Sequence, residues 1–415
     1  MSNKVPQIRF TGYSDAWVQR NLGDVIENQY NGQTPSRNNP SFWGGEIPWL
    51  TSGELNHGIV NDTVETITAA GQKDANLKIV PAGTFVMAIT GLEAPGTRGN
   101  SSILGFDTTV NQSVMALFPN EKLDTKFLFQ WYQKVGEEYG ISYTQGTKQQ
   151  SYNAELIKIL PFTLPDSVEE QQRVAELLFK LDDLIAANQR KLDLLKEQKN
   201  GYLQKMFPKN GAKVPELRFA GFADDWEERK LGELGSTFTG LTGKTKEDFG
   251  HGDAKFVTYM NVFQNAVASL EQLDSIEIDP KQNAVKKGDV FFTTSSETPE
   301  EVGMSSVWKY NYDNVYLNSF TFGYRPNIEF DLDYLAAMLR STTVRKKITF
   351  LAQGISRYNI SKTKMMDIEV PVPSLEEQAR IGSFFKQLDD TIALHQRKLD
   401  LLKEQKKGFL QKMFV

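Results

Sequence analysis

The sequence predicts an α+β protein in which two globular mixed α/β domains are joined by two long antiparallel coiled-coil helices. Three observations predict this fold: the chain repeats itself, each half ends in a heptad pattern, and 415 residues suffice for two or three domains. The repeat also implies a pseudo-two-fold arrangement. We place the first domain at 1–160, a helix at 161–207, a linker at 208–213, the second domain at 214–372 and a second helix at 373–415.

The repeat is clearest at the ends of the two halves. Residues 5–23 (VPQIRFTGYSDAWVQRNLG) and 214–232 (VPELRFAGFADDWEERKLG) are identical at ten of 19 positions. QRKLDLLKEQK occurs at both 189–199 and 396–406. The middles have diverged, although Ser151-Tyr152-Asn153 still aligns with Arg357-Tyr358-Asn359. Similar ends around different middles suggest one frame that presents two different surfaces.

Each predicted helix carries an apolar stripe with alternating steps of four and three residues, which is the period of a coiled coil. The stripes consist of Val174, Leu178, Leu181, Ile185, Asn188, Leu192, Leu195, Lys199, Tyr202 and Met206, and of Ile381, Phe385, Leu388, Ile392, His395, Leu399, Leu402, Lys406, Phe409 and Met413. Such a seam must be buried, and the simplest partner is the other helix of the same chain. Pairing between two chains is the alternative.

The start of each helix carries the same signal. Ser167-Val168-Glu169-Glu170 and Ser374-Leu375-Glu376-Glu377 both predict a capping box, in which the serine and the third residue after it satisfy each other's backbone. Farther along, Lys199 and Lys406 are polar residues at core positions, which indicates a register device or an opening of the seam. The acidic pairs beside the stripes, at 182–183 and 389–390, are interpreted as solvated or partner-facing.

The globular domains are predicted to contain short strands separated by Gly, Asn, Thr and Pro. Strands are expected at Thr84–Ile89, Val114–Phe118, Phe256–Tyr259 and Val290–Thr294, and helices at Lys126–Gly136 and Tyr334–Lys347.

Composition excludes several classes of protein. The chain has no cysteine, so it has no disulfide framework, cysteine zinc site or thiol nucleophile. No apolar run approaches the roughly 18 residues of a membrane span, and no signal-peptide core is present, so we expect a cytoplasmic protein. The histidines are scattered, and no metal site is predicted.

Charge alone does not favour a nucleic-acid partner, because the formal net charge is −5. The charge is unevenly placed, however. The segment from Leu339 to Met366 contains seven basic residues and no acidic one. A solvated helix face followed by a loop and a DNA-facing surface are both consistent with it.

Several segments together resemble the specificity (S) subunit of type I restriction-modification systems. RFTGYSDAWVQRNLGDV and RFAGFADDWEERKLGEL are similar to the openings of that family's target-recognition domains. GQTPSRNNPSFWGGEIPWLTSGEL (32–55) resembles the loop and strand that follow. The segments that begin SYNAELIKILPF and RYNISKTKMMDIEV resemble the exits into the spacer helices. The second domain departs from the pattern, since GLTGKTKEDFGHGDAKFVTYMNV lacks the PSR and the tryptophan pair, so we expect it to read a different half-site.

The resemblance implies a non-catalytic subunit that binds double-stranded DNA at a two-part site. Each domain would read one half-site. The helices would set the spacing and dock two modification (methyltransferase) subunits, which carry S-adenosylmethionine. A motor-nuclease restriction subunit would complete the enzyme. No cofactor is expected in this chain.

Candidate DNA-binding residues come from the polar loops of both domains. They are Gln33, Ser36, Arg37, Asn38, Lys148, Gln149 and Tyr152 in the first domain, and Lys244, Lys246, Arg357, Tyr358 and Asn359 in the second. The Arg, Gln and Asn side chains suit base edges, whereas the Lys and Tyr side chains suit phosphates. No catalytic residues are predicted.

Two rival functions remain open. A fused restriction-methyltransferase would need cofactor and catalytic motifs, which we do not find; Gly240–Thr245 fails the phosphate-loop spacing. A coiled-coil adaptor that binds only proteins differs from our interpretation in lacking salt-dependent DNA binding.

Overall fold

The computed structural model describes residues 5–94, 96–146, 150–209 and 211–415. The chain divides into two compact units. Unit 1 comprises Met1–Gln189 and Arg397–Val415, and unit 2 comprises Arg190–Gln396. Each unit therefore contains one globular domain together with part of each long helix.

The first domain is built on a five-stranded sheet with the order β2-β9-β6-β7-β4 and a three-stranded sheet with the order β5-β3-β8. The strands of the larger sheet are β2 (Ile26–Asn31), β4 (Ile59–Val60), β6 (Phe85–Ala88), β7 (Ser101–Leu104) and β9 (Val114–Pro119). Those of the smaller sheet are β3 (Trp43–Leu50), β5 (Glu65–Ile67) and β8 (Thr109–Val110). Every residue of β6 and β7 is buried, which explains their continuous runs of apolar and small residues.

A separate strand pair brackets this domain, because β1 (Val18–Asn21) pairs antiparallel with β10 (Pro161–Leu164). The helical elements are η1 (Leu22–Asp24), η2 (Pro40–Phe42), η3 (Ser52–Glu54), α1 (Ala69–Asp74), α2 (Thr125–Ser142) and α3 (Ala154–Lys158). The Asp124 carboxylate caps α2 by accepting from the Phe127 amide. The apolar residues of α2 pack into the main core of unit 1.

The second domain repeats this plan. Its four-stranded sheet has the order β12-β19-β15-β17, its three-stranded sheet the order β14-β13-β18, and its bracketing pair is β11-β21. These strands are β11 (Glu227–Lys230), β12 (Gly235–Thr239), β13 (Phe249–Val257), β14 (Leu273–Ile276), β15 (Val290–Thr293), β17 (Ser305–Val307), β18 (Val315–Leu317), β19 (Thr321–Pro326) and β21 (Glu369–Val372). A further pair joins β16 (Ser295–Ser296) to β20 (Tyr358–Asn359). In both domains the middle strand of the small sheet has one antiparallel and one parallel neighbour.

The helical elements of the second domain show where the predicted boundaries were wrong. They are α5 (Leu231–Leu234), η4 (Lys246–Asp248), α6 (Tyr259–Gln264), η5 (Leu270–Gln272), α7 (Leu332–Leu339), α8 (Thr342–Phe350) and α9 (Lys362–Met366). The strand predicted to reach Tyr259 ends at Val257, because the Thr258 hydroxyl caps α6. The helix predicted at Tyr334–Lys347 is two helices, because Ser341 adopts an extended conformation and caps α8.

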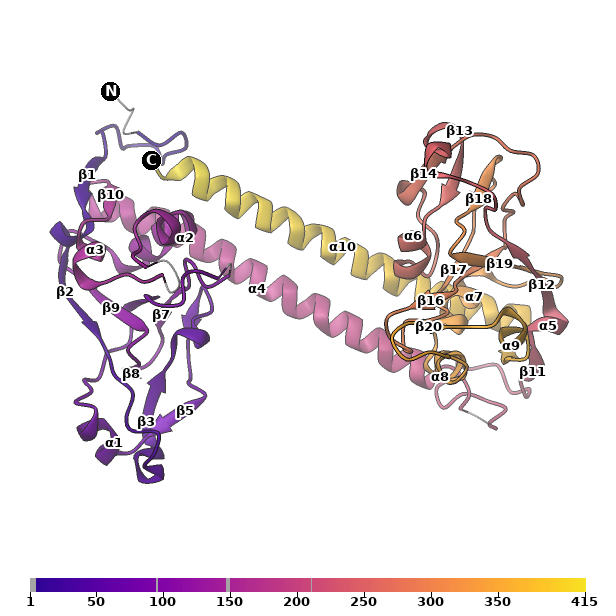
Figure 1. The fold of residues 1–415 in the computed structure, drawn as a ribbon, viewed down its shortest axis with the longest axis horizontal. Coiled ribbons are helices and arrows are strands. Elements are labelled where there is room, and N and C mark those ends of the chain that lie inside the picture. The colour runs from indigo at the N-terminus through magenta and orange to yellow at the C-terminus, as the bar shows by residue number, and fades with distance from the viewer. Residues whose placement is uncertain (1–4, 95, 147–149, 210) are drawn as a thin grey trace. The chain divides into compact units, whose positions relative to one another are not determined.

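Two long helices provide the predicted heptad seams. They are α4 (Val168–Lys205), with 38 residues, and α10 (Leu375–Met413), with 39. Every stripe residue is buried or partly buried. In unit 1, Lys406 of α10 lies beside Asp182 of α4, while Met413 and Phe414 enter the core that contains Val174. The two segments therefore run antiparallel, and Figure 1 shows the end of α10 near β1 and β10.

In unit 2 the later part of α4 packs against the first part of α10. The Tyr202 and Phe384 rings meet edge to face at 4.9 Å, and Phe207 stacks against Phe385 at 5.9 Å. The helices thus pair within one chain, as the simpler of the two pairing hypotheses predicts.

The start of each long helix differs from the predicted capping box in one respect. Ser167 does cap α4, since its hydroxyl accepts from the Glu170 amide at 3.2 Å. The Glu170 carboxylate does not reach back to the serine. It accepts from Arg9 Nε and Nη2 at 2.7 and 2.9 Å and from Trp17 Nε1 at 3.3 Å.

The second half repeats this contact. Glu377 accepts from Arg218 at 2.7 and 2.8 Å and from Trp226 Nε1 at 2.9 Å. The identical Arg and Trp of the repeated openings therefore attach each domain to the start of its long helix.

None of the helices in the described part of the chain combines the length and the apolar composition that crossing a membrane requires.

Candidate nucleic-acid interface

The first candidate surface is built on β3 of the small sheet. A bulge interrupts the pairing of β3 with β5, so that both Trp43 and Ile47 lie opposite Ile67. Gly44, inside the bulge, has a backbone φ angle of +74°, which residues other than glycine rarely adopt. The bulge brings Trp43 next to Trp49, with ring centroids 5.0 Å apart and planes at 86°.

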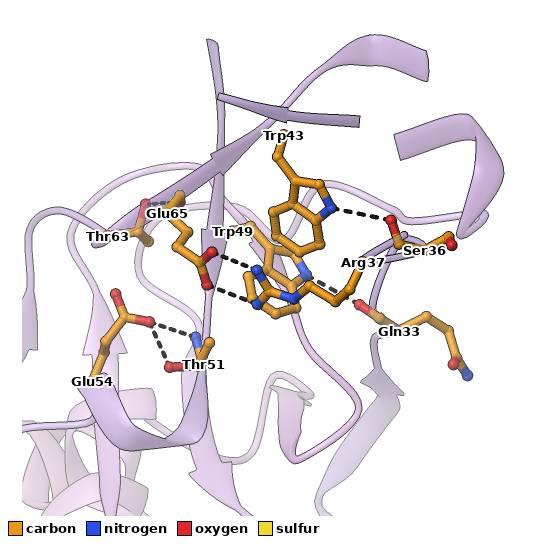
Figure 2. A network of polar contacts seen from close by, with 9 residues as sticks. All are labelled: Gln33, Ser36, Arg37, Trp43, Trp49, Thr51, Glu54, Thr63 and Glu65. Atoms are coloured by element: carbon orange, nitrogen blue, oxygen red, sulfur yellow. Dashed lines mark hydrogen bonds and ion pairs between the residues drawn. The ribbon is translucent and has the colours of Figure 1, made fainter. Parts of the chain in front are cut away.

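Arg37 lies against this tryptophan pair. Its guanidinium carbon is 3.7 Å from the Trp43 ring centroid and 5.1 Å from that of Trp49. Nη1 and Nη2 donate to the two oxygens of Glu65 at 2.5 and 2.8 Å. Figure 2 shows the guanidinium against the indole rings with the Glu65 carboxylate on its other side. The Arg37 side chain is nevertheless 52% exposed.

The ion pair moves the pKa of each group farther from neutral pH, so both groups are charged there. The hydrogen bond from Arg37 lowers the pKa of the Glu65 carboxyl, and the same bond raises the pKa of Arg37. Glu65 takes two of the five N–H donors of the guanidinium, so three remain for a ligand. Arg37 is therefore a planar, charged donor with a fixed orientation at the protein surface.

Neighbouring groups hold the Glu65 segment in place. The Glu54 carboxylate accepts from the Thr51 amide at 2.8 Å and from the Val64 amide at 2.6 Å. The Thr63 hydroxyl donates to the Glu65 carbonyl at 2.8 Å. The end of β3 and the start of β5 are thus tied together beneath the ion pair.

The other candidates in this loop are exposed. The indole N–H of Trp49 donates to the Gln33 carbonyl at 3.0 Å, and that of Trp43 donates to the Ser36 carbonyl at 3.2 Å. These bonds fix the backbone of the loop and leave the side chains outside; the Gln33 amide points away from the network (Figure 2). Asn38 is also exposed. The structure therefore places Gln33, Ser36 and Asn38 around Arg37.

The second domain has the same framework with different side chains. Phe249 and Phe256 of β13 meet at 5.1 Å and 65° across an equivalent bulge. Asp274 lies opposite Phe256 as Glu65 lies opposite Trp49. An aromatic pair is thus retained, although the sequence comparison noted only the loss of the tryptophans.

The lysines predicted for this region differ in availability. Lys246 is exposed in η4. Lys244 forms an ion pair with Asp279 at 2.8 Å, and the hydrogen bond to Asp279 raises its pKa. The corresponding loop of the second domain contains no arginine equivalent to Arg37. Of its two lysines, Lys244 is already paired with Asp279.

A second pair of candidate surfaces is formed by short closed loops. In the first domain the amides and carbonyls of Gln145 and Ser151 bond to each other at 3.0 Å in both directions. In the second domain Gln353 and Asn359 do the same at 2.9 and 2.8 Å. Lys148 and Gln149, both predicted to bind DNA, lie outside the described residues.

These bonds correct the sequence alignment of the two halves. Ser151 corresponds to Asn359, not to Arg357, so Tyr152 corresponds to Ile360. The amides of Tyr152 and Ile360 bond to equivalent carbonyls at the ends of β6 and β15. Tyr152 is 3% exposed within the main core, and burial raises the pKa of its hydroxyl. Because a phosphate cannot reach this hydroxyl in the folded domain, we leave Tyr152 out of the proposed interface.

The remaining candidates lie together in the second loop. Arg357 is exposed, and its Nε and Nη2 donate to the Ser295 hydroxyl at 3.3 and 3.1 Å. Tyr358 is partly buried and Asn359 is exposed, both in β20. Beside them lies a cavity of about 410 Å³, which Tyr259, Phe263, Glu301 and Arg357 help to line.

The basic segment from Leu339 to Met366 contains two kinds of residue. Arg340 donates to the carbonyls of Ser305, Val262 and Phe263 at 2.7 to 3.1 Å. Arg345 likewise donates to the carbonyls of Glu300, Val302 and Gly303 at 2.7 Å.

Burial lowers the pKa of both arginines to about 10, so both remain charged at neutral pH. Arg340 and Arg345 hold the domain together, and Lys347 forms an ion pair with Glu228. Of the other basic residues of the segment, Lys346, Arg357 and Lys364 are exposed and Lys362 is partly buried.

Sequence reasoning missed Glu65, Asp274 and the aromatic pair of the second domain. The available signal was the glycine-rich stretch after an aromatic residue in both halves, WGG at 43–45 and FGHG at 249–252, which marks the bulges. Among the described residues, no group of three or more His, Asp or Glu side chains could hold a metal ion.

Comparison with known proteins relates the whole chain to one group. The model of the Methylase_S family, described as the type I restriction modification DNA specificity domain, matches residues 14–197 and 223–404. The specificity subunit of the type I restriction enzyme MjaVIII from Methanocaldococcus jannaschii is 22% identical over 405 residues, which cover 95% of this chain and 91% of the relative.

Two solved structures share the fold. The type I restriction-modification S subunit from M. genitalium has a TM-score of 0.65 at 15% identity, with 99% of each chain covered. A chain from a structural study of complex assembly and conformational transition of the type I R-M system has a TM-score of 0.56 at 17% identity, with 96% of this chain and 97% of that chain covered.

Proposed function

The chain belongs to the type I restriction modification DNA specificity domain family, and we propose that each of its two domains reads one half of a split DNA site. As a specificity subunit it is a non-catalytic part of a type I restriction-modification complex.

The observation that carries the proposal is the orientation of Arg37. Arginine reads guanine by donating two parallel hydrogen bonds to O6 and N7 in the major groove. Such readout costs less conformational entropy when the guanidinium plane is fixed before binding, and Trp43 and Glu65 fix it here. Three N–H groups are left to donate, so Arg37 is our principal candidate for a base contact in the first half-site.

The exposed neighbours of Arg37 complete this surface. Gln33 and Asn38 carry amides that can pair with adenine, and Ser36 can bind a base or a phosphate. Lys148 and Gln149 lie outside the described residues and remain candidates from the sequence alone. In the second domain we assign base contacts to Arg357 and Asn359, and phosphate contacts to Lys246, Lys244 and Tyr358.

The two domains should read different sequences. The second domain has phenylalanines in place of Trp43 and Trp49 and lacks an arginine equivalent to Arg37. Its exposed Asp274 occupies the position of Glu65 and can accept a hydrogen bond from cytosine N4. A shared framework with different donors and acceptors supports a site whose halves are unrelated in sequence.

The long helices are proposed to dock two modification subunits and to set the spacing between half-sites. Each unit has exposed leucines on both helices: Leu184 and Leu401 in unit 1, and Leu194 and Leu394 in unit 2. Leu194 and Leu401 occupy equivalent positions of the repeated QRKLDLLKEQK segment, so each unit presents one of them, which suits two copies of one protein partner. A helix of 38 residues is about 57 Å long, which exceeds the ~34–36 Å repeat of the duplex.

The partners would supply the chemistry. We propose that the modification subunits bind S-adenosylmethionine and methylate the site, and that a motor-nuclease subunit joins them for cleavage. The protein would then act in the cytoplasm, where these partners meet DNA.

The proposal is tested by mapping modified adenines genome-wide in cells with and without this chain, while the methyltransferase partner is retained. A split methylation motif that disappears with the chain supports DNA readout. An unchanged map would contradict it and favour an adaptor that binds only proteins. Salt-dependent DNA binding of the assembled complex provides an independent check on the adaptor alternative.

A further inference from the structure

The closed loop of the second domain exposes an apolar side chain at its tip. Ile355, between Gln353 and Asn359, is 95% exposed. Burying an isoleucine side chain is favourable, so full exposure leaves this stabilisation unused in the free protein. A single exposed apolar residue is common on protein surfaces, and its setting must decide whether it has a role.

The loop around Ile355 is closed by local backbone contacts. Two backbone hydrogen bonds close the loop between Gln353 and Asn359. Gly354 has a φ of +144°, and a Cβ there would lie 2.0 Å from the Arg357 carbonyl oxygen. Only glycine fits this position, so the tight closed conformation of the loop depends on Gly354.

The same loop carries Arg357, two residues farther on. The Arg357 guanidinium is anchored to the Ser295 hydroxyl by Nε and Nη2, while Nη1 makes no hydrogen bond to the described residues. The loop also borders the cavity that Tyr259 and Phe263 help to line. One short closed loop therefore carries both an exposed apolar side chain and an exposed cationic donor.

We propose that Ile355 contacts the 5-methyl group of a thymine in the second half-site, beside the base or phosphate that Arg357 contacts. The major groove offers one apolar group on its base edges, which is this methyl group, and aliphatic side chains recognise it by contact. The inference rests on the proposed function, because it requires the second domain to face DNA. It adds a base preference that arises from an apolar contact.

The test uses a set of DNA duplexes in which one thymidine of the second half-site, on either strand, is replaced at a time by deoxyuridine, which lacks only the 5-methyl group. Binding is measured with the full chain in complex with its methyltransferase partner. For the wild-type protein we expect about a fourfold loss of affinity at one position, the value of one buried methyl group, and no change elsewhere.

The Ile355→Ala variant provides the decisive comparison. It should bind the thymine site more weakly than wild type and should lose nothing further when the critical thymine becomes deoxyuridine. Ile159→Ala, which removes an exposed isoleucine from the first domain, should retain the full deoxyuridine effect. An unchanged thermal unfolding midpoint for both variants excludes misfolding as the cause.

Three results would overturn the inference. They are a second half-site without thymine, equal wild-type affinity for every deoxyuridine duplex, and a deoxyuridine effect that persists in Ile355→Ala. A variant that binds DNA normally but associates poorly with the methyltransferase would instead assign the loop to a protein contact. In each case the split methylation motif can remain intact, so the proposed function fails only in the separate mapping experiment.

Discussion

Lys199 of α4 forms an ion pair with Asp389 of α10 in unit 2, with 2.5 Å between Nζ and Oδ1. The duplication repeats the pair in unit 1, where Lys406 of α10 meets Asp182 of α4 at 2.5 Å. The lysine lies on α4 in one pair and on α10 in the other. The polar core positions and the acidic residues beside the stripes are therefore partners of each other, which explains both features of the sequence.

Charge reversal tests whether this ion pair stabilises the helix pairing. Lys199→Asp places two carboxylates together and should lower the unfolding midpoint of unit 2 by about 2–4 °C, equivalent to roughly 1 kcal/mol for a partly exposed pair. The exchange variant Lys199→Asp with Asp389→Lys should recover most of the loss. Lys196→Asp, at an exposed position of the same helix, is the control. An exchange variant no more stable than the single variant would contradict a direct interaction.

Glu170 should be the residue whose loss most weakens the attachment of the first domain to α4. Its carboxylate is buried and accepts from both Arg9 and Trp17, so Glu170→Ala leaves a largely buried cation without its partner. We expect a loss of about 3–5 kcal/mol in the free energy of unfolding of unit 1, measured by urea denaturation. Glu169→Ala, next to it on the exposed face, should cost far less. Equal losses for the two variants would show that the buried contact is unimportant.

The basic segment of the second domain should separate into structural and DNA-binding residues. Arg340→Ala strands three carbonyls and should cost at least about 2 kcal/mol of unfolding free energy. Arg357→Ala should leave stability close to wild type and should weaken binding or relax the second half-site. Thermal unfolding and methylation mapping of both variants measure these effects. A stable Arg340→Ala protein with altered sequence preference would reverse the assignment.

The Arg37–Glu65 pair predicts a specific pH dependence of stability. Because the hydrogen bond from Arg37 lowers the folded-state pKa of Glu65 below its ordinary value of 4.5, the pair stabilises the fold at neutral pH. That contribution is lost as the pH falls below about 4.5 and through the folded-state pKa. The difference in unfolding midpoint between wild type and Glu65→Gln should therefore shrink on acidification. Glu46→Gln, which changes an exposed residue of β3, is the control, and its unfolding midpoint should stay close to that of wild type at neutral and at acidic pH.

Much of the fold follows from patterns that operate locally or by repetition. The heptad stripes predicted α4 and α10 because a period of 3.5 residues leaves few alternatives. The duplication predicted two similar domains. Ser341 and Thr258 were missed as helix caps because a single serine or threonine inside an apolar or strand-like run is a weak signal.

The candidate site was harder to predict because it depends on contacts between distant segments. Arg37 was identified from its loop, but Glu65 lies 28 residues away and reaches it only through the pairing of β5 with β3. The burial of Tyr152 was not anticipated, because a two-residue error in aligning the loops concealed its correspondence with the buried Ile360. Neither relationship can be obtained from residue type alone.

The most direct test of the central claim is the methylation motif produced with Arg37→Ala. If each domain reads its own half-site, the first half should lose its preference at one position, with a cost of about 1–3 kcal/mol for the preferred base. The second half and the gap should remain as in wild type. A motif that is unchanged, or that is relaxed equally in both halves, would contradict the assignment of one half-site to each domain.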